Sequence, residues 1–447
     1  MASRPCRDNG LLGDLFILMA GELDLCAEIA YFCVLMNLIS VRMKKILLFF
    51  VLLAGLTACS SKPANYTVII SLDGSRWDYA DYYDMPFFDS LATVGVKARM
   101  EPSFPSSTFP NHYTMATGLV PDHHGLVNNS FWDPETDRNY SISGKDTRFD
   151  PYFYGGEPIW ITAQKQGVKC GVVYWVGSDI AVGPEGNAYP TYWRHWDEQP
   201  HWNFDQRVEE IVRLMSLPEA ERPQLVMGYF DEPDHQGHVH GPFSPETKAM
   251  AEHMDSLMHA LYLRLKALPH GDRINFILAG DHGMTEISPE RFIGWYDVMP
   301  QEWTKKVVGN LPTSIWAKEG YADSLYNRLS KVEHLHVWKH GEVPEYLHYG
   351  TSNRLGDLIV SPDLGWQFNF APSRNHGAHG FDCKETDMMV AFRAIGPDFK
   401  DAYDAPYTEG EKSSFRNIDL YPMLCKLLGV KPAPVDGKLE RIQHILR

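Results

Sequence analysis

Three short apolar runs in this chain are each followed at once by acidic side chains. The runs, at residues 67–72, 225–230 and 274–279, are almost continuously apolar, which is typical of parallel strands buried on both faces of a sheet. They are followed by Asp73, by Asp231 and Asp234, and by Asp281. Because ligand sites in open α/β sheets lie outside the carboxyl ends of the strands, we expect these acids to meet at one edge of the sheet.

The rest of the chain alternates strands and helices around those runs. The patterns predict a strand at 169–175, a long amphipathic helix at 244–268, a strand at 388–395 and a closing helix at 417–428. Residues 288–370 are rich in Trp, Gly and Pro and break this rhythm, which indicates a smaller, partly β insertion that covers the site. The predicted fold class is α/β, with a largely parallel central sheet flanked by helices.

Histidines accompany the acids at the ends of these runs. The chain holds the pairs Asp231 with His235 and Asp234 with His238, then His240, the dipeptide Asp281-His282, and His376 and His379. Carboxylate oxygen and neutral imidazole are ligands that suit zinc. The alternative is a polar loop with hydrogen-bonded histidines, but the density of these groups favours a metal site.

A hydroxyl cluster marks the start of a predicted helix within residues 101–129. Ser106, Ser107 and Thr108 are followed by Pro110 and a helix-compatible run to Thr117. Free backbone N–H groups at a helix start attract phosphate, and Pro is tolerated in a first turn. A Thr hydroxyl is a weak nucleophile unless a base or a metal lies beside it. Two divalent metals would activate it and clamp the attacking and leaving oxygens of an in-line displacement.

The net charge of the chain limits the kinds of partner that it can bind. A formal net charge of -16 argues against a nonspecific nucleic-acid binder, whose footprint would be basic. An anionic substrate must then be drawn by local positive charge such as metal ions.

The N-terminal residues resemble a bacterial lipoprotein signal. Met43 is followed by two lysines, an apolar run and the segment LTAC that ends at Cys59, so we interpret 43–58 as a signal peptide, Cys59 as the lipidated residue and 59–65 as a linker. Residues 1–42 are interpreted as a mis-called extension; the alternative is a true membrane segment, for which the apolar run is too short. We therefore expect an exported bacterial lipoprotein, associated with the periplasm or outer membrane.

Several strings in the chain resemble one family. SLDG at 71–74, TFPNHYTMATGL at 108–119, GEPIW at 156–160, EPDHQGHVHGP at 232–242, GDHGM at 280–284 and HGFD at 379–382 look like the nucleotide pyrophosphatase/phosphodiesterase family (type I phosphodiesterase) of the alkaline phosphatase superfamily. The resemblance runs from about Tyr66 to the C-terminus, so residues 66–447 are expected to form one phosphodiesterase domain with an alkaline-phosphatase-like fold.

The resemblance implies a role for each matching residue. Two Zn²⁺ ions would be held, one by Asp73, Thr108, Asp281 and His282 and the other by Asp234, His238 and His379. Thr108 would be the nucleophile, and Asn129 would steady a phosphate oxygen. Phe109 would lie against a nucleobase, with one of Tyr192, Trp193 or Trp196 on its other side. Some nucleotide-cleaving relatives carry a lysine where this chain has Gly155.

These features predict a two-zinc hydrolase. It would cleave phosphodiester or pyrophosphate bonds of nucleotides through a phosphothreonine and release nucleoside monophosphates, with no nucleic-acid binding expected. The first alternative is a phosphomonoesterase, a phospholipid head-group phosphodiesterase or a phosphonate hydrolase using the same site. The second is a non-catalytic binding lipoprotein, which would be expected to have lost a ligand or the nucleophile.

Overall fold

The computed structural model describes residues 65–180, 189–407 and 410–447. The chain divides into Met1–Pro63 and Ala64–Arg447, and only the second unit is described here. The predictions for residues 1–42, the signal peptide and the lipidated Cys59 fall outside the described residues. Within the described residues, none of the helices combines the length and the apolarity that crossing a bilayer requires.

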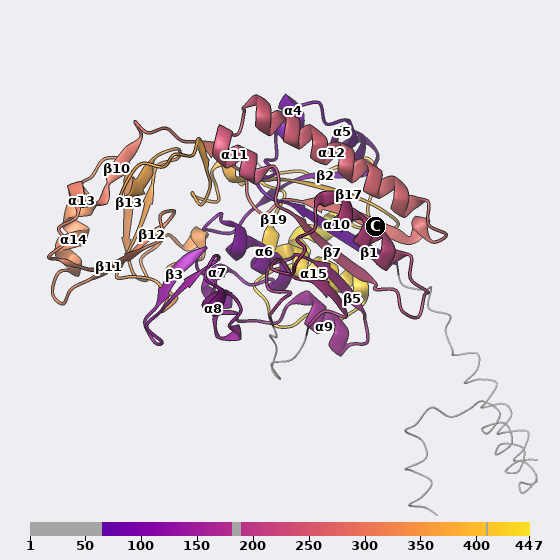
Figure 1. Ribbon diagram of the computed structural model, residues 1–447, viewed down its shortest axis with the longest axis horizontal. Coiled ribbons are helices and arrows are strands. Elements are labelled where there is room, and N and C mark those ends of the chain that lie inside the picture. The colour runs from indigo at the N-terminus through magenta and orange to yellow at the C-terminus, as the bar shows by residue number, and fades with distance from the viewer. Residues whose placement is uncertain (1–64, 181–188, 408–409) are drawn as a thin grey trace, which may run out of the picture. The chain divides into compact units, whose positions relative to one another are not determined.

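A nine-stranded sheet forms the centre of the described unit (Figure 1). Its strands are, in spatial order, β18 (Tyr403–Asp404), β2 (Val96–Glu101), β17 (Val390–Ile395), β8 (Ile274–Ala279), β1 (Tyr66–Leu72), β7 (Leu225–Phe230), β5 (Cys170–Val173) and β6 (Tyr192–Arg194), with β19 (Phe415–Arg416) also paired to β2. The three predicted apolar runs are thus the adjacent strands β8, β1 and β7. All three run parallel, and Ile70 lies opposite Leu278 on one side and Gly228 on the other.

The sheet is largely parallel, as predicted, with one exception in its interior. β17 pairs antiparallel with both β2 and β8. It begins at Val390, two residues later than expected, because Thr386–Met388 forms a 3₁₀ turn. The expected strand at 169–175 is likewise shorter, since the backbone leaves the sheet after Val173.

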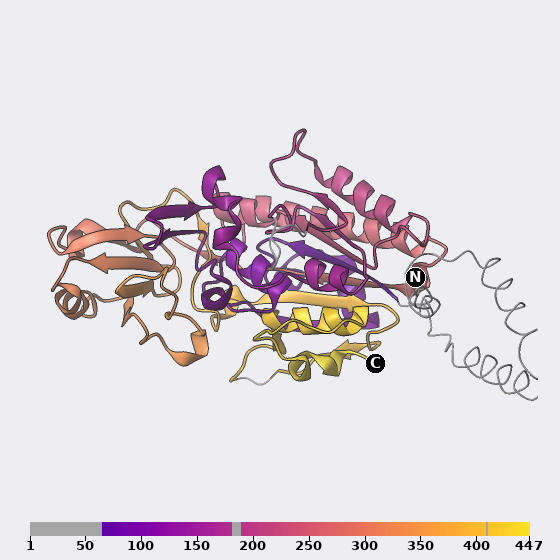
Figure 2. The same cartoon turned by 90° about the horizontal axis from the view of Figure 1, so that it is seen from below.

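Helices cover both faces of this sheet, and Figure 2 shows α12 and α15 on opposite sides of it. The helices are α4 (Tyr79–Tyr82), α5 (Pro86–Val94), α6 (Thr108–Thr117), α7 (Pro121–His124), α8 (Lys145–Arg148), α9 (Ile159–Lys165), α10 (Phe204–Met215), α11 (Asp234–His240), α12 (Pro245–Lys266), α13 (Trp295–Val298), α14 (Ala322–Leu329), α15 (Leu420–Leu428) and α16 (Leu439–Ile442). α5, α10 and α12 share one hydrophobic core, and α6, α9 and α15 share the other.

The long helix shows how the sequence pattern produces this packing. Ser244 caps α12 by accepting a hydrogen bond from the Thr247 N–H, and Pro245 occupies the first turn. Met254, Met258 and Leu261 are buried at helical spacing, so burial of one apolar stripe holds the helix on the sheet.

The predicted insertion has its own sheet and core. Its strands are β10 (Phe292–Gly294), β11 (Thr304–Val308), β12 (Thr313–Ala317), β13 (Leu335–Lys339), β14 (Leu358–Pro362) and β15 (Gln367–Asn369). β11, β12, β14 and β13 pair antiparallel in that order, and Ile315, Leu325 and Leu358 are buried between this sheet and α14. Figure 1 shows the insertion in orange beside the central sheet.

Two short pairings complete the fold near the strand ends. β3 (Ser130–Asp133) and β4 (Arg138–Ser141) form a hairpin, and β9 (Thr285–Glu286) pairs with β16 (Gly377–Ala378). Cys170, Cys383 and Cys425 are buried and unbridged, so the fold of this unit is held by its cores.

Candidate functional site

Residues that follow the three central strands meet at one edge of the sheet. Asp73 follows β1, Asp281 and His282 follow β8, and Asp234 and His238 lie in α11, just after β7. Because these strands are parallel neighbours, their carboxyl ends coincide and bring the side chains together. The structure therefore brings these predicted site residues together at this edge.

A close backbone contact ties the first two segments together. Gly74 has a φ of +66°, and a Cβ there would lie 2.8 Å from the Asp234 Cα. The Asp234 N–H also donates to the Asp73 carbonyl at 3.1 Å. Only glycine combines this conformation with this approach, so residue 74 sets the spacing between two acidic side chains of the site.

Thr108 stands at the first position of α6, as the sequence predicted. Its Oγ1 lies 3.1 Å from the His282 Nε2. Asn111 holds the turn before the helix, because its amide donates to the Pro105 and Ser107 carbonyls. The hydroxyl is thus fixed among the acids and histidines of the site.

One group of possible metal ligands consists of Asp234, His238 and His379. The Nε2 atoms of His238 and His379 are 3.1 Å apart. Asp234 Oδ2 lies 3.5 Å from His238 Nε2, and Asp234 Oδ1 lies 3.7 Å from His379 Nε2. The three residues assigned to one zinc are therefore together.

A second group contains Asp73, Asp234 and His282, so Asp234 belongs to both groups. Asp73 Oδ1 lies 3.4 Å from His282 Nε2. Asp281, which was predicted for this ion, sits beside the group, with Oδ2 3.1 Å from the same nitrogen. The sharing of Asp234 was not predicted from the sequence.

The three histidines are oriented in the same way. The Nδ1 atoms of His238, His282 and His379 each lie 2.9 Å from a backbone carbonyl, those of Gly377, Gly283 and Ser106. An Nδ1–H that donates to a carbonyl leaves the Nε2 lone pair free, which is the usual arrangement of a metal-bound imidazole. All three Nε2 atoms face the acidic side chains.

These residues fit a pair of divalent cations. Buried oxygens of Asp73, Asp234 and Asp281 have no hydrogen-bond partner in the described structure, and uncompensated buried carboxylates are costly. Two Nε2 lone pairs 3.1 Å apart would likewise repel unless a cation lay between them. The donor set of carboxylate oxygens and imidazole nitrogens suits zinc.

The electrostatics of the site agree with this fit. Burial, with the nearby Asp281 and Asp234, holds the pKa of Asp73 well above its usual range. Burial lowers the pKa of His282 to about 4 and that of His379 to about 3. Both imidazoles are therefore neutral at pH 7, which is the form that binds a metal.

Asn129 and Tyr229 border the same site. The Asn129 Oδ1 accepts a hydrogen bond from the Phe109 N–H at 3.0 Å, which leaves its amide NH₂ available to a ligand. The Tyr229 hydroxyl donates to Asp73 Oδ2 at 2.6 Å. Tyr229 was not singled out from the sequence, although it lies at the carboxyl end of a predicted strand.

A cavity of about 250 Å³ adjoins Thr108, Asp73 and Asp234. Its aromatic walls are Phe109, Tyr174, Trp175, Trp196 and Tyr229, and the Arg148 side chain also lines it. Flat aromatic walls beside a phosphate site can stack on a nucleobase. Tyr174 and Arg148 were missed because neither lies in a recognisable motif.

The aromatic residues that the sequence suggested as nucleobase contacts lie in different places. Trp196 lines this cavity, as does Phe109. Trp193 is 40 % exposed and stacks on Tyr189, with ring centroids 4.8 Å apart, and the structure does not bring it into the lining. The Tyr192 hydroxyl donates to the Glu221 carbonyl, away from the cavity.

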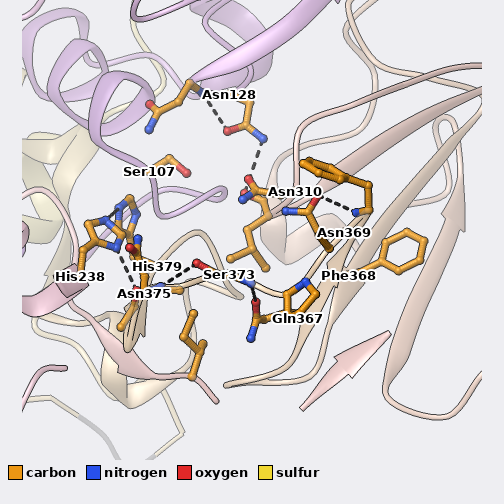
Figure 3. A pocket seen from close by; sticks show the side chains of 18 residues that line it. Ser107, Asn128, His238, Asn310, Gln367, Phe368, Asn369, Ser373, Asn375 and His379 are labelled. Atoms are coloured by element: carbon orange, nitrogen blue, oxygen red, sulfur yellow. Dashed lines mark hydrogen bonds between the residues drawn. The ribbon is translucent and has the colours of Figure 1, made fainter. Parts of the chain in front are cut away.

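A second cavity, of about 350 Å³, adjoins the other ligands of the site (Figure 3). His238 and His379 line it, together with Ser107, Asn129 and residues of the insertion. The group of ligands therefore contributes Asp73 and Asp234 to one cavity, and His238 and His379 to the other.

The other acids and histidines that the sequence offered as ligands lie outside the site. Asp231 Oδ1 accepts a hydrogen bond from Arg207 Nη1 at 2.7 Å, and His235, His240 and His376 are exposed. Of the two Asp-x-x-x-His pairs in the sequence, the pair that lies in the site is thus Asp234 with His238.

Comparisons with known proteins agree on one family. The model of type I phosphodiesterase/nucleotide pyrophosphatase matches residues 67–382. The chain is 32% identical over 417 residues to venom phosphodiesterase CdcPDE of Crotalus durissus collilineatus, covering 88% of this chain and 48% of the relative. It is 32% identical over 400 residues to ectonucleotide pyrophosphatase/phosphodiesterase family member 1 of Mus musculus, covering 85% and 42%. The chain thus spans about half the length of these curated relatives.

Solved structures show the same fold. An inactive variant of murine ectonucleotide pyrophosphatase/phosphodiesterase 5 in complex with AMP matches with a TM-score of 0.79 and 29% identity, covering 86% of this chain and 100% of that one. The human protein of the same name matches with a TM-score of 0.79 and 30% identity over the same shares. From its sequence, its fold and the family match over residues 67–382, this chain belongs to the type I phosphodiesterase/nucleotide pyrophosphatase family of the alkaline phosphatase superfamily.

Proposed function

We propose that the protein is a metal-dependent hydrolase that cleaves phosphodiester or pyrophosphate bonds of nucleotides and releases nucleoside monophosphates. The observation that carries this proposal is the position of Thr108, at a helix start and with its Oγ1 3.1 Å from His282 Nε2. Relatives named as phosphodiesterases and a structural neighbour in complex with AMP support the substrate class.

Two divalent ions, for which zinc fits the donors, would be held by Asp73, Asp281 and His282 with Thr108, and by Asp234, His238 and His379. When bound, they would supply polarisation of the phosphate and neutralisation of its charge.

Side chains of the protein carry out the attack, stabilise the developing charge and bind the substrate. Thr108 Oγ1 attacks phosphorus as the bond to the leaving group breaks, and water then cleaves the phosphothreonine. The free Asn129 amide donates to a phosphate oxygen and stabilises its developing charge. Phe109 and Trp196 line the cavity that takes the nucleobase, and α6 holds the phosphate at its N-terminus.

A hydrolysis panel tests this proposal. The purified protein with added zinc is offered a nitrophenyl diester of a nucleoside 5′-monophosphate, nitrophenyl phosphate and a choline-type head-group ester, with Thr108→Ala beside each. We expect the nucleotide diester to be preferred and Thr108→Ala to abolish its turnover. Preference for the monoester or the head-group ester would reject the substrate class, and turnover that survives Thr108→Ala would reject the nucleophile.

We also propose, from residues 43–59 of the sequence, that the protein is exported and anchored by a lipid on Cys59. LTAC at 56–59 follows two lysines and an apolar run, which is the order of parts in a lipoprotein signal. The intact mass of the membrane-bound protein tests this. A chain that begins at an acylated Cys59 supports the anchor, and peptides that cross residues 58 and 59 from the mature protein contradict it.

A further inference from the structure

The insertion reaches the candidate site through one hairpin turn. Its strands β11 and β12 are joined by residues 309–312, and Asn310 and Leu311 of this turn line the second cavity. The Thr313 hydroxyl donates to the Asn310 carbonyl at 3.3 Å, which braces the turn against its own strand. The proposed chemistry uses no residue of the insertion, yet this turn packs against residues that take part in it.

Asn128 connects this turn to the segment before β3. Its Nδ2 donates to the Pro312 carbonyl at 3.1 Å and lies 3.5 Å from the Leu311 carbonyl oxygen (Figure 3). Asn128 is buried, and a hydrogen bond shielded from water is stronger than one at the surface. The amide therefore fixes the position of Asn128 relative to the insertion.

The same side chain holds the next residue. The Asn128 Oδ1 accepts a hydrogen bond from the Asn129 N–H at 2.7 Å. The Asn129 carbonyl accepts the Ile142 N–H at 3.1 Å, and the Asn129 Oδ1 accepts the Phe109 N–H at 3.0 Å. Because Phe109 directly follows Thr108, this contact keeps the Asn129 amide beside the nucleophile. The direction of the free NH₂ then depends on where Asn128 holds the main chain of Asn129.

Gly309 allows the turn to approach Asn128 closely. Its φ is +81°, and a Cβ there would lie 2.7 Å from the Pro312 carbonyl oxygen and 3.3 Å from the Asn128 Nδ2. Both atoms of the hydrogen bond between the turn and Asn128 therefore lie against residue 309. A side chain at this position must displace the carbonyl, the amide or both.

The opposite side of the turn lies against the residue that follows His379. Gly380 has a φ of +106°, and a Cβ there would lie 2.6 Å from the Leu311 carbonyl oxygen and 2.8 Å from the Leu311 Cβ. The Leu311 side chain is buried in a cluster with Ile287, Ala378, Phe381 and Met388. The turn thus lies between Gly380 and Asn128 and is held on both sides.

We propose that Asn128 is a positioning residue of the hydrolysis: through it, the turn at 309–312 aims the Asn129 amide at the phosphate oxygen. The inference rests on the proposed function, in which the Asn129 NH₂ stabilises the charge that develops on that oxygen. Such a donor contributes only when it is aimed correctly, and a misplacement of about 1 Å in an active site can cost about a hundredfold in rate. The insertion then contributes to catalysis through the position of Asn129.

A purely structural role of Asn128 predicts a different result. Loss of its contacts would then lower the stability of the protein but spare kcat per folded chain, or it would lower kcat equally with and without the Asn129 amide. A positioning role predicts a loss of kcat that disappears once residue 129 carries no amide. A double-mutant cycle distinguishes the two roles.

The cycle compares the zinc-loaded protein with Asn128→Ala, Asn129→Ala and the double variant on a nitrophenyl nucleotide diester. We expect Asn129→Ala to lower kcat about a hundredfold and Asn128→Ala to lower it about tenfold. KM should change less than about twofold, because the donor acts on charge that develops only after the substrate is bound. In the Asn129→Ala background, Asn128→Ala should lower kcat no further. An equal loss of kcat in both backgrounds would overturn the inference.

Gly309 and Gly320 provide a matched pair within the insertion. Both have a φ of +81°, but among the described residues nothing beyond the chain neighbours of Gly320 lies within 4 Å of a Cβ added there. Alanine therefore meets the same unfavourable backbone conformation at both positions, and a close contact only at residue 309. We expect Gly309→Ala to lower kcat and Gly320→Ala to leave it unchanged. Equal values of kcat in the two variants would contradict the role of the turn.

Zinc content and unfolding distinguish this effect from loss of the metals or of the fold. In the described structure, the side-chain hydrogen bonds of Asn128 go to Asn129 and to the turn, and not to the residues assigned to the metals. We therefore expect elemental analysis to find the same zinc content in Asn128→Ala as in the unchanged protein. Urea unfolding gives the folded fraction, so that kcat is compared per folded chain. A loss of zinc or of folded protein that accounts for the whole fall in kcat would also overturn the inference.

The outcomes separate this inference from the proposed function. If the unchanged protein does not hydrolyse the diester, the proposed function fails and this inference fails with it. If the diester is hydrolysed and Asn129→Ala lowers kcat, the proposed function stands and the cycle decides on Asn128 alone. If Asn129→Ala leaves kcat intact, the role of that amide is wrong, and so is the positioning role of Asn128.

Discussion

The Nε2 atoms of His238 and His379 face each other at 3.1 Å, although the two residues come from α11 and from the segment after β16. Each ring is held by an Nδ1 contact of 2.9 Å to a backbone carbonyl. Two lone pairs in this position are best satisfied by a shared cation, so the arrangement of the two rings suits metal binding.

Replacement of His379 tests that organisation. His379→Ala removes one Nε2 donor, so we expect the zinc content of the protein to fall by about one ion per chain and kcat to fall more than about tenfold. Elemental analysis and a nucleotide diester assay measure both. His240→Ala is the control, because this exposed histidine in the same helix lies outside the site; an equal loss of zinc in both variants would contradict the assignment.

Replacing Gly74 distinguishes the effect of its close contact with Asp234 from the effect of its backbone conformation. Gly74→Ala places a Cβ 2.8 Å from the Asp234 Cα, so the acid must shift and zinc should bind more weakly. Gly167 also has a positive φ, of +83°, but nothing lies within 4 Å of its added Cβ. Gly167→Ala should therefore cost only about 1 kcal/mol of stability and leave zinc affinity intact. Isothermal titration with zinc and urea unfolding distinguish the two effects, and equal zinc affinity in the two variants would refute the spacing role of Gly74.

Trp196 and Trp193 offer a matched pair for the nucleobase. Trp196 lines the cavity beside Thr108, whereas Trp193 stacks on Tyr189. Loss of one stacking partner predicts that Trp196→Ala raises KM for a nucleotide diester about tenfold, while Trp193→Ala changes it little. Steady-state kinetics measure KM for both variants. A larger rise in KM for Trp193→Ala than for Trp196→Ala would place the nucleobase at β6 instead.

His124 predicts how stability depends on pH. Burial lowers its pKa to about 3, and the neutral ring accepts the Leu126 N–H at Nδ1 and contacts Thr114 at Nε2. In the unfolded chain His124 binds a proton near pH 6.5, whereas in the folded chain its ring stays neutral at that pH. The free energy of unfolding should therefore fall by about 2 to 3 kcal/mol at this residue as pH drops from 6.5 to 4.5.

Urea unfolding at several pH values measures this slope. His124→Gln keeps a donor and an acceptor but does not titrate, so its profile should be flatter than that of the unchanged protein by that amount. Parallel profiles would show that His124 does not carry the effect.

The site was largely predictable because its residues follow uninterrupted apolar strands. A buried parallel strand is visible as a run, and an acid directly after it can lie only at the carboxyl edge of the sheet. Asp73 and Asp281 are of this kind, whereas Thr108 was predicted from the hydroxyl cluster at a helix start. The position of Asp234 in both ligand groups depends instead on the approach of α11 to Gly74, which no pattern in the sequence expresses.

The cavities could be predicted only in part. Trp193 and Trp196 are three residues apart in an aromatic loop, and the sequence does not tell which of them lines the cavity beside Thr108. In the lining of the second cavity, Asn369 ends β15 and Asn310 lies just before β12. The short, mixed segments of the insertion did not allow these strands to be predicted. The antiparallel direction of β17 was also not predictable, because its apolar run looks the same in either direction.

The donor atoms come from segments spread between Asp73 and His379, almost the full length of the described unit. Closing such long loops is entropically unfavourable, and a metal site that the unfolded chain lacks cannot hold an ion before the topology is complete. We therefore expect metal binding to require the completed topology. We then expect the ions available in the compartment where the chain folds to decide which metal it holds.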